Sequence, residues 1–350
     1  MRNPWPLILM SSRSTLDSRA PARDASRRTE TCVVCGASKL APIRRYRAES
    51  PAGRALFGHA HLYRCAGCDL VQALPLPRAD SLDLYYTSAY RRGGRYGSDA
   101  ADTARFPRDN LFFFNRGLSI AERVAAPLRS RAGEAPRILD IGAGYGHILH
   151  ALGEFFPHAV RSAQEISEPC VQHLRALGFE TTTEPFERFV RGRTFDLIVL
   201  SHVLEHLAAP AAVLARLRDA LTPNGLLYVE VPHVPENAHT AHLDSPWAPR
   251  HDEPHLTFFT AGSLQKLLER SGLVAEFVES AGPLYREISS FRHHLPPLMP
   301  TARRLLPRRV MGVLRRQAQA RGVSLAEREE SFYAYGGRRI WLRSLSGRAG

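Results

Sequence analysis

The stretch from Arg137 to Gly146, with the sequence RILDIGAGYG, constrains the fold of this chain more than any other. A short apolar run ends in Asp140, then Gly142, Gly144 and Gly146 alternate with other residues, and apolar residues follow at helical spacing. This order predicts a strand, a tight turn and a helix. Glycines in such a turn leave room for a ligand to approach the first amide groups of the helix. An ordinary strand-to-helix turn without a ligand is the alternative that this stretch alone leaves open.

The glycine spacing distinguishes two classes of ligand. A dinucleotide fingerprint has the spacing G-x-G-x-x-G, whereas Gly142, Gly144 and Gly146 alternate and Asp140 precedes them. This arrangement resembles motif I of the class I S-adenosylmethionine (SAM) dependent methyltransferases. The resemblance implies that the turn packs against the methionine and ribose end of SAM. It also implies that an acidic residue ends the next strand and accepts hydrogen bonds from the ribose hydroxyls, and Glu165 lies at a suitable distance.

Strands and helices alternate along the rest of this region. Apolar runs predict further strands at residues 179–183, 195–200, 226–231 and 273–280. Such alternation implies a parallel sheet with helices on both faces. The resemblance adds an antiparallel strand that closes the sheet, for which residues 331–342 are the candidate. The predicted fold is therefore α/β, a doubly wound, mostly parallel seven-stranded sheet of the Rossmann-like methyltransferase type, with a small N-terminal zinc-ribbon module.

The zinc module is predicted from the cysteines. Four of the five cysteines form two Cys-x-x-Cys pairs, which are Cys32 with Cys35 and Cys65 with Cys68. Two such pairs can supply four thiolates to a tetrahedral zinc ion, a closed site whose role is structural. His59 and His61 rank below the cysteines as ligands, and a redox pair or disulfides are the alternatives. Because the first thirty residues lack the apolar core of a signal peptide, zinc and a cytoplasmic location are expected.

The order of the modules carries a second resemblance. The cysteine pairs are followed by a segment with Tyr86 and Tyr90, and then by the glycine turn. This order resembles a bacterial group that includes sugar C-methyltransferases acting on nucleotide-linked deoxysugars. In that group the N-terminal module forms one wall of the substrate pocket and a tyrosine from it reaches the active site. Tyr86 and Tyr90 are the candidates here, and simple packing on the core is the alternative.

A polar segment follows the predicted strand at 195–200. Ligands of open α/β sheets bind beyond the carboxyl ends of the strands, so Ser201 and His202 are expected at the cofactor, and Glu205 and His206 at the reacting groups. In some quinone-biosynthesis O-methyltransferases, which this segment resembles, two acids and a histidine hold a divalent ion. Here His202 replaces the first acid, and a metal at Glu205 and His206 is left open. Phe186 follows the third strand, where relatives contact the adenine.

The segment around His255 is the second catalytic candidate. It resembles the Glu-His-x-x-Tyr-Phe-Ser segment of the sugar C-methyltransferases, in which the histidine is a catalytic base. His255 matches that histidine, whereas Pro254 replaces the acid and Phe258 the tyrosine. A histidine with a pKa near neutrality can accept a proton from a hydroxyl group or an acidic carbon. A histidine-bearing loop without a catalytic role is the alternative.

The charge of the chain gives little information about its partners. The formal net charge is +13, carried almost wholly by arginine, since Lys39 and Lys266 are the only lysines. Together with the many Ala, Gly and Pro residues, this bias fits the base composition of a gene, so nucleic acid is not the expected partner. Residues 303–321 form a basic helical pattern that could contact an anionic membrane surface or a phosphate-bearing substrate, or stay solvated. No apolar run approaches the roughly 20 residues of a membrane-spanning helix.

The expected domain boundaries follow from these patterns. They are a disordered tail at 1–30, a zinc-binding module at 31–75, a linker and substrate wall at 76–130, a SAM-binding core at 131–282, a basic helical insertion at 283–329, and the final strand at 330–345. The predicted function is SAM-dependent methyl transfer to a small-molecule or glycan acceptor, above all a sugar that is nucleotide-, lipid- or polysaccharide-linked. An rRNA or tRNA methyltransferase, a quinone-type O-methyltransferase and a SAM-binding scaffold are the alternatives. The sequence does not predict an oligomeric state.

Overall fold

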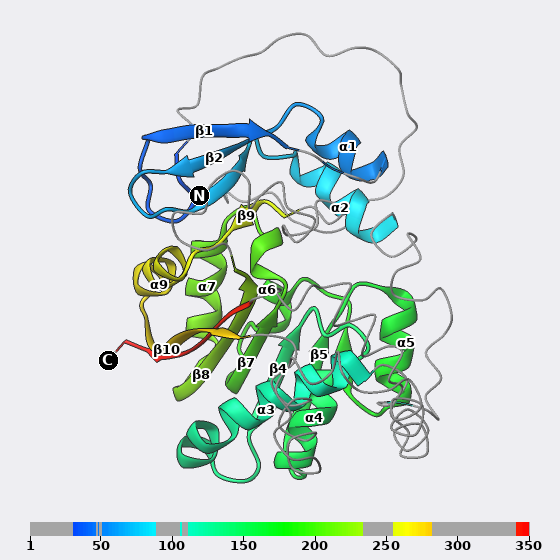
Figure 1. Cartoon of the computed structure of the whole chain (residues 1–350). Coiled ribbons are helices and arrows are strands. Elements are labelled where there is room, and N and C mark those ends of the chain that lie inside the picture. The colour runs from blue at the N-terminus through cyan, green and yellow to red at the C-terminus, as the bar shows by residue number, and fades with distance from the viewer. Residues whose placement is uncertain are drawn as a thin grey trace, which may run out of the picture.

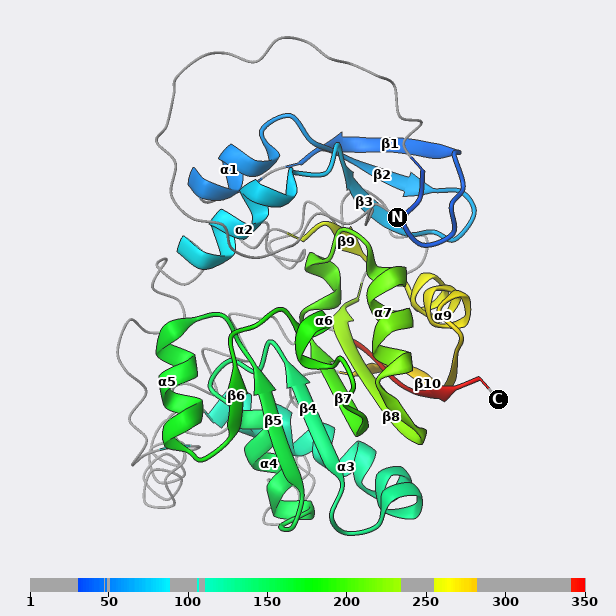
Figure 2. The ribbon, with the colours of Figure 1, turned by 180° about the vertical axis from the view of Figure 1, so that it is seen from behind.

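The computed structural model of this chain describes residues 31–46, 48, 51–88, 106, 111–233, 255–281 and 341–349. These residues form a seven-stranded sheet with helices on both faces and a separate four-stranded sheet. Figures 1 and 2 show the small sheet, drawn mostly in blue, above the end of the large sheet at which the parallel arrows point. The predicted tail and the whole of the predicted basic insertion, residues 283–329, lie outside the described residues.

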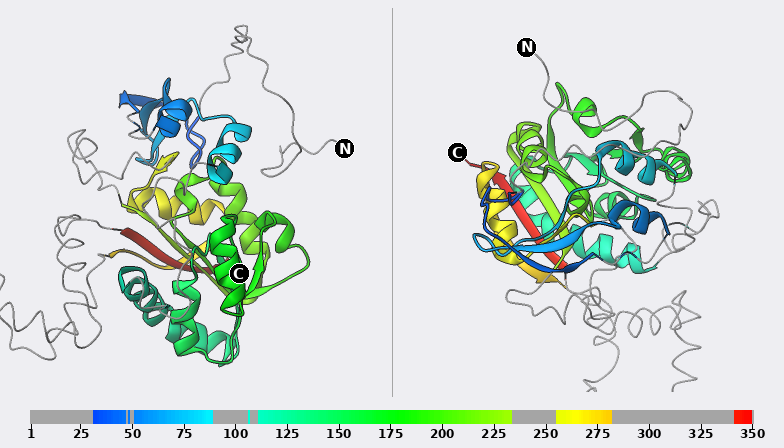
Figure 3. Two further views of the ribbon diagram at one scale, coloured as in Figure 1. Left: turned by 90° about the vertical axis from the view of Figure 1, so that its right-hand side faces the viewer. Right: turned by 90° about the horizontal axis from the view of Figure 1, so that it is seen from above.

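The large sheet has the predicted α/β topology. Its strands are β4 (Arg137–Ile141), β5 (Val160–Gln164), β6 (Glu180–Thr182), β7 (Phe195–Ser201), β8 (Leu221–Pro232), β10 (Leu273–Ala281) and β11 (Trp341–Arg348). They lie in the order β10-β11-β8-β7-β4-β5-β6. Strands β4 to β8 pair in parallel, and β11 pairs antiparallel with both β8 and β10. Figure 3 shows β11, in red, alongside β10. The expected doubly wound, mostly parallel sheet is confirmed.

Two apolar cores cover the two faces of this sheet. One core includes side chains of α3 (Leu111–Ala132), α4 (His147–Phe155) and α5 (Glu168–Ala176), and the other those of α6 (Phe186–Phe189), α7 (Pro210–Asp219) and α9 (Ala261–Arg270). Along β7, Leu197 and Val199 join the first core while Ile198 and Leu200 join the second. This is the period of two that a strand buried on both faces requires. Each fully buried Leu or Ile side chain contributes on the order of 2 kcal/mol to folding.

Two predicted strand positions were wrong at their ends. Strand β8 already begins at Leu221, which is buried and pairs with Phe195, whereas the predicted strand begins at residue 226. The closing strand extends to Arg348, beyond the predicted end at residue 342, and its described part begins at Trp341. Leu342 and Leu345 of β11 are fully buried in opposite cores, and this burial decides the position of the strand. The aromatic residues before 341 lie outside the described residues.

The small sheet is not confined to the N-terminal module. The elements of the module are β1 (Leu40–Arg45), α1 (Pro51–Phe57), β2 (His61–Cys65), β3 (Val71–Leu74) and α2 (Ala79–Ser88). Its fourth strand is β9 (Thr257–Phe258), from far along the chain, which pairs antiparallel with β3. The predicted boundaries of 31–75 are therefore incomplete, because the free edge of β3 takes its partner from the region assigned to the core.

Among the helices in the described part of the chain, none has the length and hydropathy that crossing a bilayer requires.

Candidate active site

The glycine turn lies between β4 and α4. All three glycines have positive φ angles, 71° at Gly142, 58° at Gly144 and 84° at Gly146, a region that other residues rarely adopt. A Cβ atom on Gly142 would lie 2.7 Å from the Val203 side chain, and one on Gly146 would lie 2.7 Å from that of Leu174. At these two positions the neighbouring side chains and the positive φ angles disfavour any residue but glycine, and room for a ligand at the turn stays a prediction.

Glu165 follows β5 directly, as the resemblance implies, and its carboxylate is held by backbone amides. Its Oε2 atom accepts a hydrogen bond from the amide of Gly144 at 2.8 Å. Its Oε1 atom accepts from the amides of Ile166 and Ser167 at 2.9 and 2.8 Å. The turn after β4 and the end of β5 are thereby fixed to each other. Acceptance of ribose hydroxyls by Glu165 stays a prediction.

Asp140 supplies a buried acid beside the turn. It is 1% exposed, and its Oδ2 atom has no hydrogen-bond partner among the described residues. Burial raises the pKa of this carboxyl group to about 8, although the charge of Arg116 opposes the shift. A buried carboxyl oxygen without a partner suits a ligand that brings a hydrogen-bond donor or a positive charge. SAM carries both an ammonium and a sulfonium group, so the residues present fit this cofactor.

The other residues expected at the cofactor are engaged with the protein itself. Phe186 is buried in the core on the α6 face. Ser201 ends β7, and its hydroxyl accepts a hydrogen bond from the guanidinium of Arg116. His202 has a φ of 56°, unusual for a residue with a side chain, and its amide donates to the carbonyl of Glu230 at 2.8 Å. A strained backbone at the carboxyl end of a central strand is typical of functional sites.

A buried ion pair supports this segment from the side of α3. Arg116 Nε lies 2.6 Å from Glu230 Oε1, and their side chains are 12% and 3% exposed. The hydroxyl of Tyr228 donates to Glu230 Oε2 at 2.8 Å. His202 Nε2 lies 3.8 Å from Glu230 Oε1. Sequence reasoning missed Arg116 and Glu230, although Glu230 is the only acid in the apolar run 226–231.

Three predicted catalytic residues meet beyond the carboxyl end of β7. Glu205 and His206 lie in the short 3-10 turn Leu204–His206, and His255 precedes β9. Glu205 is fully buried and His255 is 3% exposed. One ligand atom from each of the three residues lies within 4.8 Å of the others. We refer to Glu205, His206 and His255 as the histidine cluster.

Two further side chains border the histidine cluster. The ring of Tyr86, on α2, meets that of His206 edge-on with 5.8 Å between centroids, and the His206 and His255 rings are 4.8 Å apart. His202 Nδ1 lies 3.1 Å from Glu205 Oε1. Tyr86 therefore reaches the cluster from the N-terminal module. Tyr90 lies outside the described residues.

The chemistry of the histidine cluster has two readings. Two imidazoles beside a buried carboxylate can accept a proton and stabilise the resulting imidazolium. The same donors, two nitrogens and one carboxylate oxygen, can hold a divalent transition-metal ion. The geometry thus brings Glu205 and His206 together with His255, which the sequence analysis treated as a separate candidate.

The four paired cysteines also converge. Cys32 and Cys68 have their sulfurs 3.5 Å apart, Cys35 and Cys65 have theirs 3.4 Å apart, and all four lie within 4.8 Å of one another. Tetrahedral zinc with sulfur ligands at about 2.3 Å needs sulfur-to-sulfur distances of about 3.8 Å, so the donor set fits zinc. The hydrogen bond between Cys32 and Cys68 lowers the pKa of Cys32 and raises the pKa of Cys68, as expected of two neighbouring thiol groups that share one proton.

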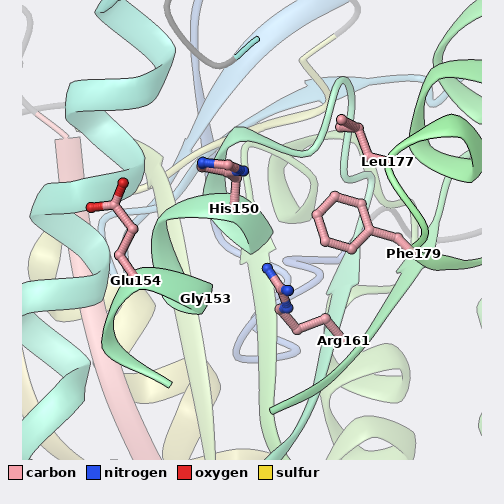
Figure 4. Close-up of a pocket in the computed structure, with 6 residues that line it drawn as sticks. All are labelled: His150, Gly153, Glu154, Arg161, Leu177 and Phe179. Atoms are coloured by element: carbon pink, nitrogen blue, oxygen red, sulfur yellow. The ribbon is translucent and has the colours of Figure 1, made fainter. Parts of the chain in front are cut away.

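A surface pocket lies away from these groups, between α4, β5 and the residues before β6. Figure 4 shows its lining, which includes His150, Arg161 and Phe179. Arg161 donates to the carbonyl of Leu149 at 3.1 Å and lies over the ring of Phe179. Arg161 sits near the start of β5, at the opposite end from Glu165. This pocket contains none of the predicted site residues, so it is not the candidate active site.

Comparison with known proteins gives consistent matches. A family described as a methyltransferase domain matches residues 115–276. Trans-aconitate 2-methyltransferase of Methylobacterium radiotolerans is 30% identical over 186 residues, 49% of this chain and 68% of that protein. Ubiquinone biosynthesis O-methyltransferase of Dinoroseobacter shibae is 30% identical over 165 residues, 44% of this chain and 65% of that protein. Malonyl-acyl-carrier protein O-methyltransferase of Halalkalibacterium halodurans is 33% identical over 112 residues, 28% of this chain and 40% of that protein. The chain thus spans less than two thirds of the last two relatives.

Proposed function

The chain belongs to the class I SAM-dependent methyltransferases, and from this premise we propose that it methylates an oxygen or carbon atom of a small-molecule acceptor. The observation that carries the proposal is the buried histidine cluster beyond the carboxyl end of β7. Strand β7 pairs with β4, which leads into the glycine turn. Val203, which lies between the end of β7 and Glu205, packs against Gly142. A proton-accepting cluster therefore lies beside the place where this family binds SAM.

The residues around the turn would hold the cofactor. SAM, when bound, supplies an electrophilic methyl group on its sulfonium. Glu165 is oriented by three backbone amides, so it can accept further hydrogen bonds without rearranging. Asp140 provides a buried carboxyl group that a cationic ligand would stabilise in its charged form. Alignment of methyl donor and acceptor is the main contribution of such a site to the rate.

The histidine cluster would receive the proton of the acceptor. A hydroxyl or an acidic carbon loses its proton as the methyl group transfers, and we assign His255 as the base. His206 lies against its ring, and Glu205 provides a negative charge that stabilises the protonated pair. Tyr86, and Tyr90 from the following segment, are the candidates for orienting the acceptor.

A sugar is the acceptor that we propose, whether nucleotide-, lipid- or polysaccharide-linked. The order of the cysteine module, tyrosine segment and methyltransferase core supports it, as does the arrival of Tyr86 at the cluster. A quinone-type O-methyltransferase is the second candidate, favoured by the ubiquinone relative and by a donor set that could hold a divalent ion.

The decisive experiment is methyl transfer from radiolabelled SAM to a panel of acceptors. Nucleotide sugars and glycan precursors should become labelled, whereas polyprenylated phenols should not. Labelling of phenols alone would overturn the sugar proposal and support the second candidate. Labelling of RNA that weakens steeply with salt would identify a nucleic-acid substrate instead.

Variants separate catalysis from a scaffold role. His255→Ala should lower kcat by about 10²- to 10⁴-fold, the usual contribution of a general base, and Glu205→Gln should also lower it. Neither variant should change the affinity for S-adenosylhomocysteine. His158→Ala, at an exposed histidine, is the matched control. Full activity of the His255 variant would exclude this residue as the base.

A further inference from the structure

The strand that follows His255 belongs to the cysteine module rather than to the core sheet. In β9, Thr257 pairs with Gln72 and Phe258 with Val71. Leu256 and Phe258 are 0% and 1% exposed and pack in the apolar cluster of the small sheet. In Figure 1 this yellow segment lies beneath the blue strands. The loop that carries the proposed base is therefore built into the N-terminal sheet.

The backbone of Leu256 joins the small sheet to the histidine cluster. Its carbonyl accepts a hydrogen bond from the amide of Ala73 at 2.9 Å, and its amide donates to the carbonyl of Glu205 at 2.8 Å. The hydroxyl of Thr257 also points at the Glu205 carbonyl, at 3.4 Å. A displacement of β3 would thus move His255 relative to Glu205.

Tyr46 holds His255 from the module side. Its hydroxyl donates to the carbonyl of His255 at 3.1 Å. The ring of Tyr46 stacks on that of Phe57 with 4.1 Å between centroids, and both side chains are buried. Because stacking and burial fix the tyrosine ring, its hydroxyl is a rigid anchor for the main chain at His255.

Gln72 connects the same strand to the first cysteine pair. Its side chain is fully buried, accepts a hydrogen bond from the amide of Val33 at 3.0 Å and donates to the carbonyl of Thr31 at 3.1 Å. These residues flank Cys32. The second cysteine pair forms the connection between β2 and β3, since Cys65 ends β2. Both cysteine pairs are therefore linked directly to β3.

We propose that the cysteine module positions His255 for methyl transfer, with Tyr46 and Gln72 as positioning residues, so that zinc at the four cysteines controls turnover without controlling cofactor binding. The proposal rests on the proposed role of His255. Metal binding organises the loops that carry its ligands. Here β3, in the hairpin organised by the cysteines, also pairs with β9. Asp140 lies on β4 and Glu165 directly follows β5, and both of these strands belong to the other sheet.

The test compares Tyr46→Phe with Tyr63→Phe in the full-length, zinc-loaded protein. Tyr46→Phe removes one hydroxyl and keeps the stacked ring, while Tyr63 is a half-buried tyrosine of β2 in the same sheet. Hydrogen exchange measured by mass spectrometry should show at least tenfold faster exchange at residues 255–260 in Tyr46→Phe and no change at 138–146. Tyr63→Phe should match the native protein in both segments.

Metal removal and kinetics complete the test. Chelation of zinc should accelerate exchange at 255–260 in the native protein while the affinity for S-adenosylhomocysteine stays within twofold. Tyr46→Phe should lower kcat about tenfold and leave the KM for SAM and the zinc content unchanged. Gln72→Leu, which removes the hydrogen bonds to Thr31 and Val33, should accelerate exchange in the same segment.

The outcomes distinguish the two proposals. If hydrogen exchange at 255–260 is as slow in Tyr46→Phe and in the zinc-free protein as in the native protein, the positioning role is overturned. Faster exchange combined with full activity of His255→Ala would overturn the proposed base, while the mechanical link between the module and residue 255 would stand.

Discussion

The amide of Gly144 donates a 2.8 Å hydrogen bond to the carboxylate of Glu165, which ties the turn after β4 to the end of the neighbouring strand. Two further amides, from Ile166 and Ser167, reach the other carboxylate oxygen. The acid is thus oriented before any ligand arrives. Orientation of this kind strengthens binding because little freedom is lost when the ligand binds.

Replacing Glu165 should weaken cofactor binding. Glu165→Gln keeps the shape but loses the charge that the three amides favour, and hydrogen bonds to charged groups contribute about 1.5–3 kcal/mol each. We expect the dissociation constant for S-adenosylhomocysteine to rise by about tenfold or more, measured by calorimetric titration. Glu168→Gln, at an exposed acid in the first turn of α5, should leave the constant unchanged. Equal binding by both variants would contradict the assigned role.

The Arg116–Glu230 pair should be important for stability. Its two side chains are 12% and 3% exposed, and Glu230→Gln would leave the guanidinium without its counter-charge. Breaking a buried pair in this way costs about 3–5 kcal/mol. Urea unfolding monitored by circular dichroism should show this loss in the free energy of unfolding. Glu276→Gln breaks the more exposed pair with Arg131 and should cost less than about 1 kcal/mol.

The protein without cofactor should lose stability between acid and mildly alkaline pH because of Asp140. Its pKa is about 8 in the folded state, against about 3.9 in an unfolded chain. The folded state therefore holds this proton over a range in which the unfolded state has released it. The resulting stabilisation is complete below about pH 4 and disappears as the pH rises through about 8. Asp140→Asn should flatten this component, and thermal unfolding at pH 6 and pH 9 would measure it. An identical pH dependence in both proteins would contradict the shift.

Metal analysis should distinguish the two clusters of metal-binding side chains. We expect about one zinc per chain, reduced in Cys68→Ser and unchanged in His255→Ala. The reason is that four thiolates form a closed zinc site, whereas the histidine cluster is assigned to proton transfer. A second metal ion that is lost in His255→Ala but kept in Cys68→Ser would make the histidine cluster a metal site and exclude His255 as a base.

Local patterns predicted the large sheet because each of its central strands carries its own signal. The run from Phe195 to Leu200 is apolar at every position but one, as burial on both faces requires, and glycines mark the turn after β4. The cysteine pairs were equally visible, since two Cys-x-x-Cys pairs are a local pattern typical of zinc sites. These features depend on neighbours in the sequence, which is why they could be predicted.

The contacts that assemble the site join residues far apart in the chain. Nothing around Tyr46 indicates that its hydroxyl meets the main chain at His255, 209 positions later. The two residues of β9 are too few to give a strand pattern, and their pairing follows from the free edge of β3. Arg116 lies in a helix whose apolar stripe concealed its ion pair with Glu230. Tertiary pairing of this kind leaves no periodic signal along the sequence.

The fourth strand of the small sheet has a consequence for how this protein can change by recombination. A gene segment that encodes only the N-terminal module would supply three of the four strands of the small sheet. In a recipient protein its β3 would pair with a different sequence in place of Thr257 and Phe258. Exchange of N-terminal modules between relatives should therefore succeed only when β3 and β9 are exchanged together. The two regions must be inherited as one unit, although almost two hundred residues separate them.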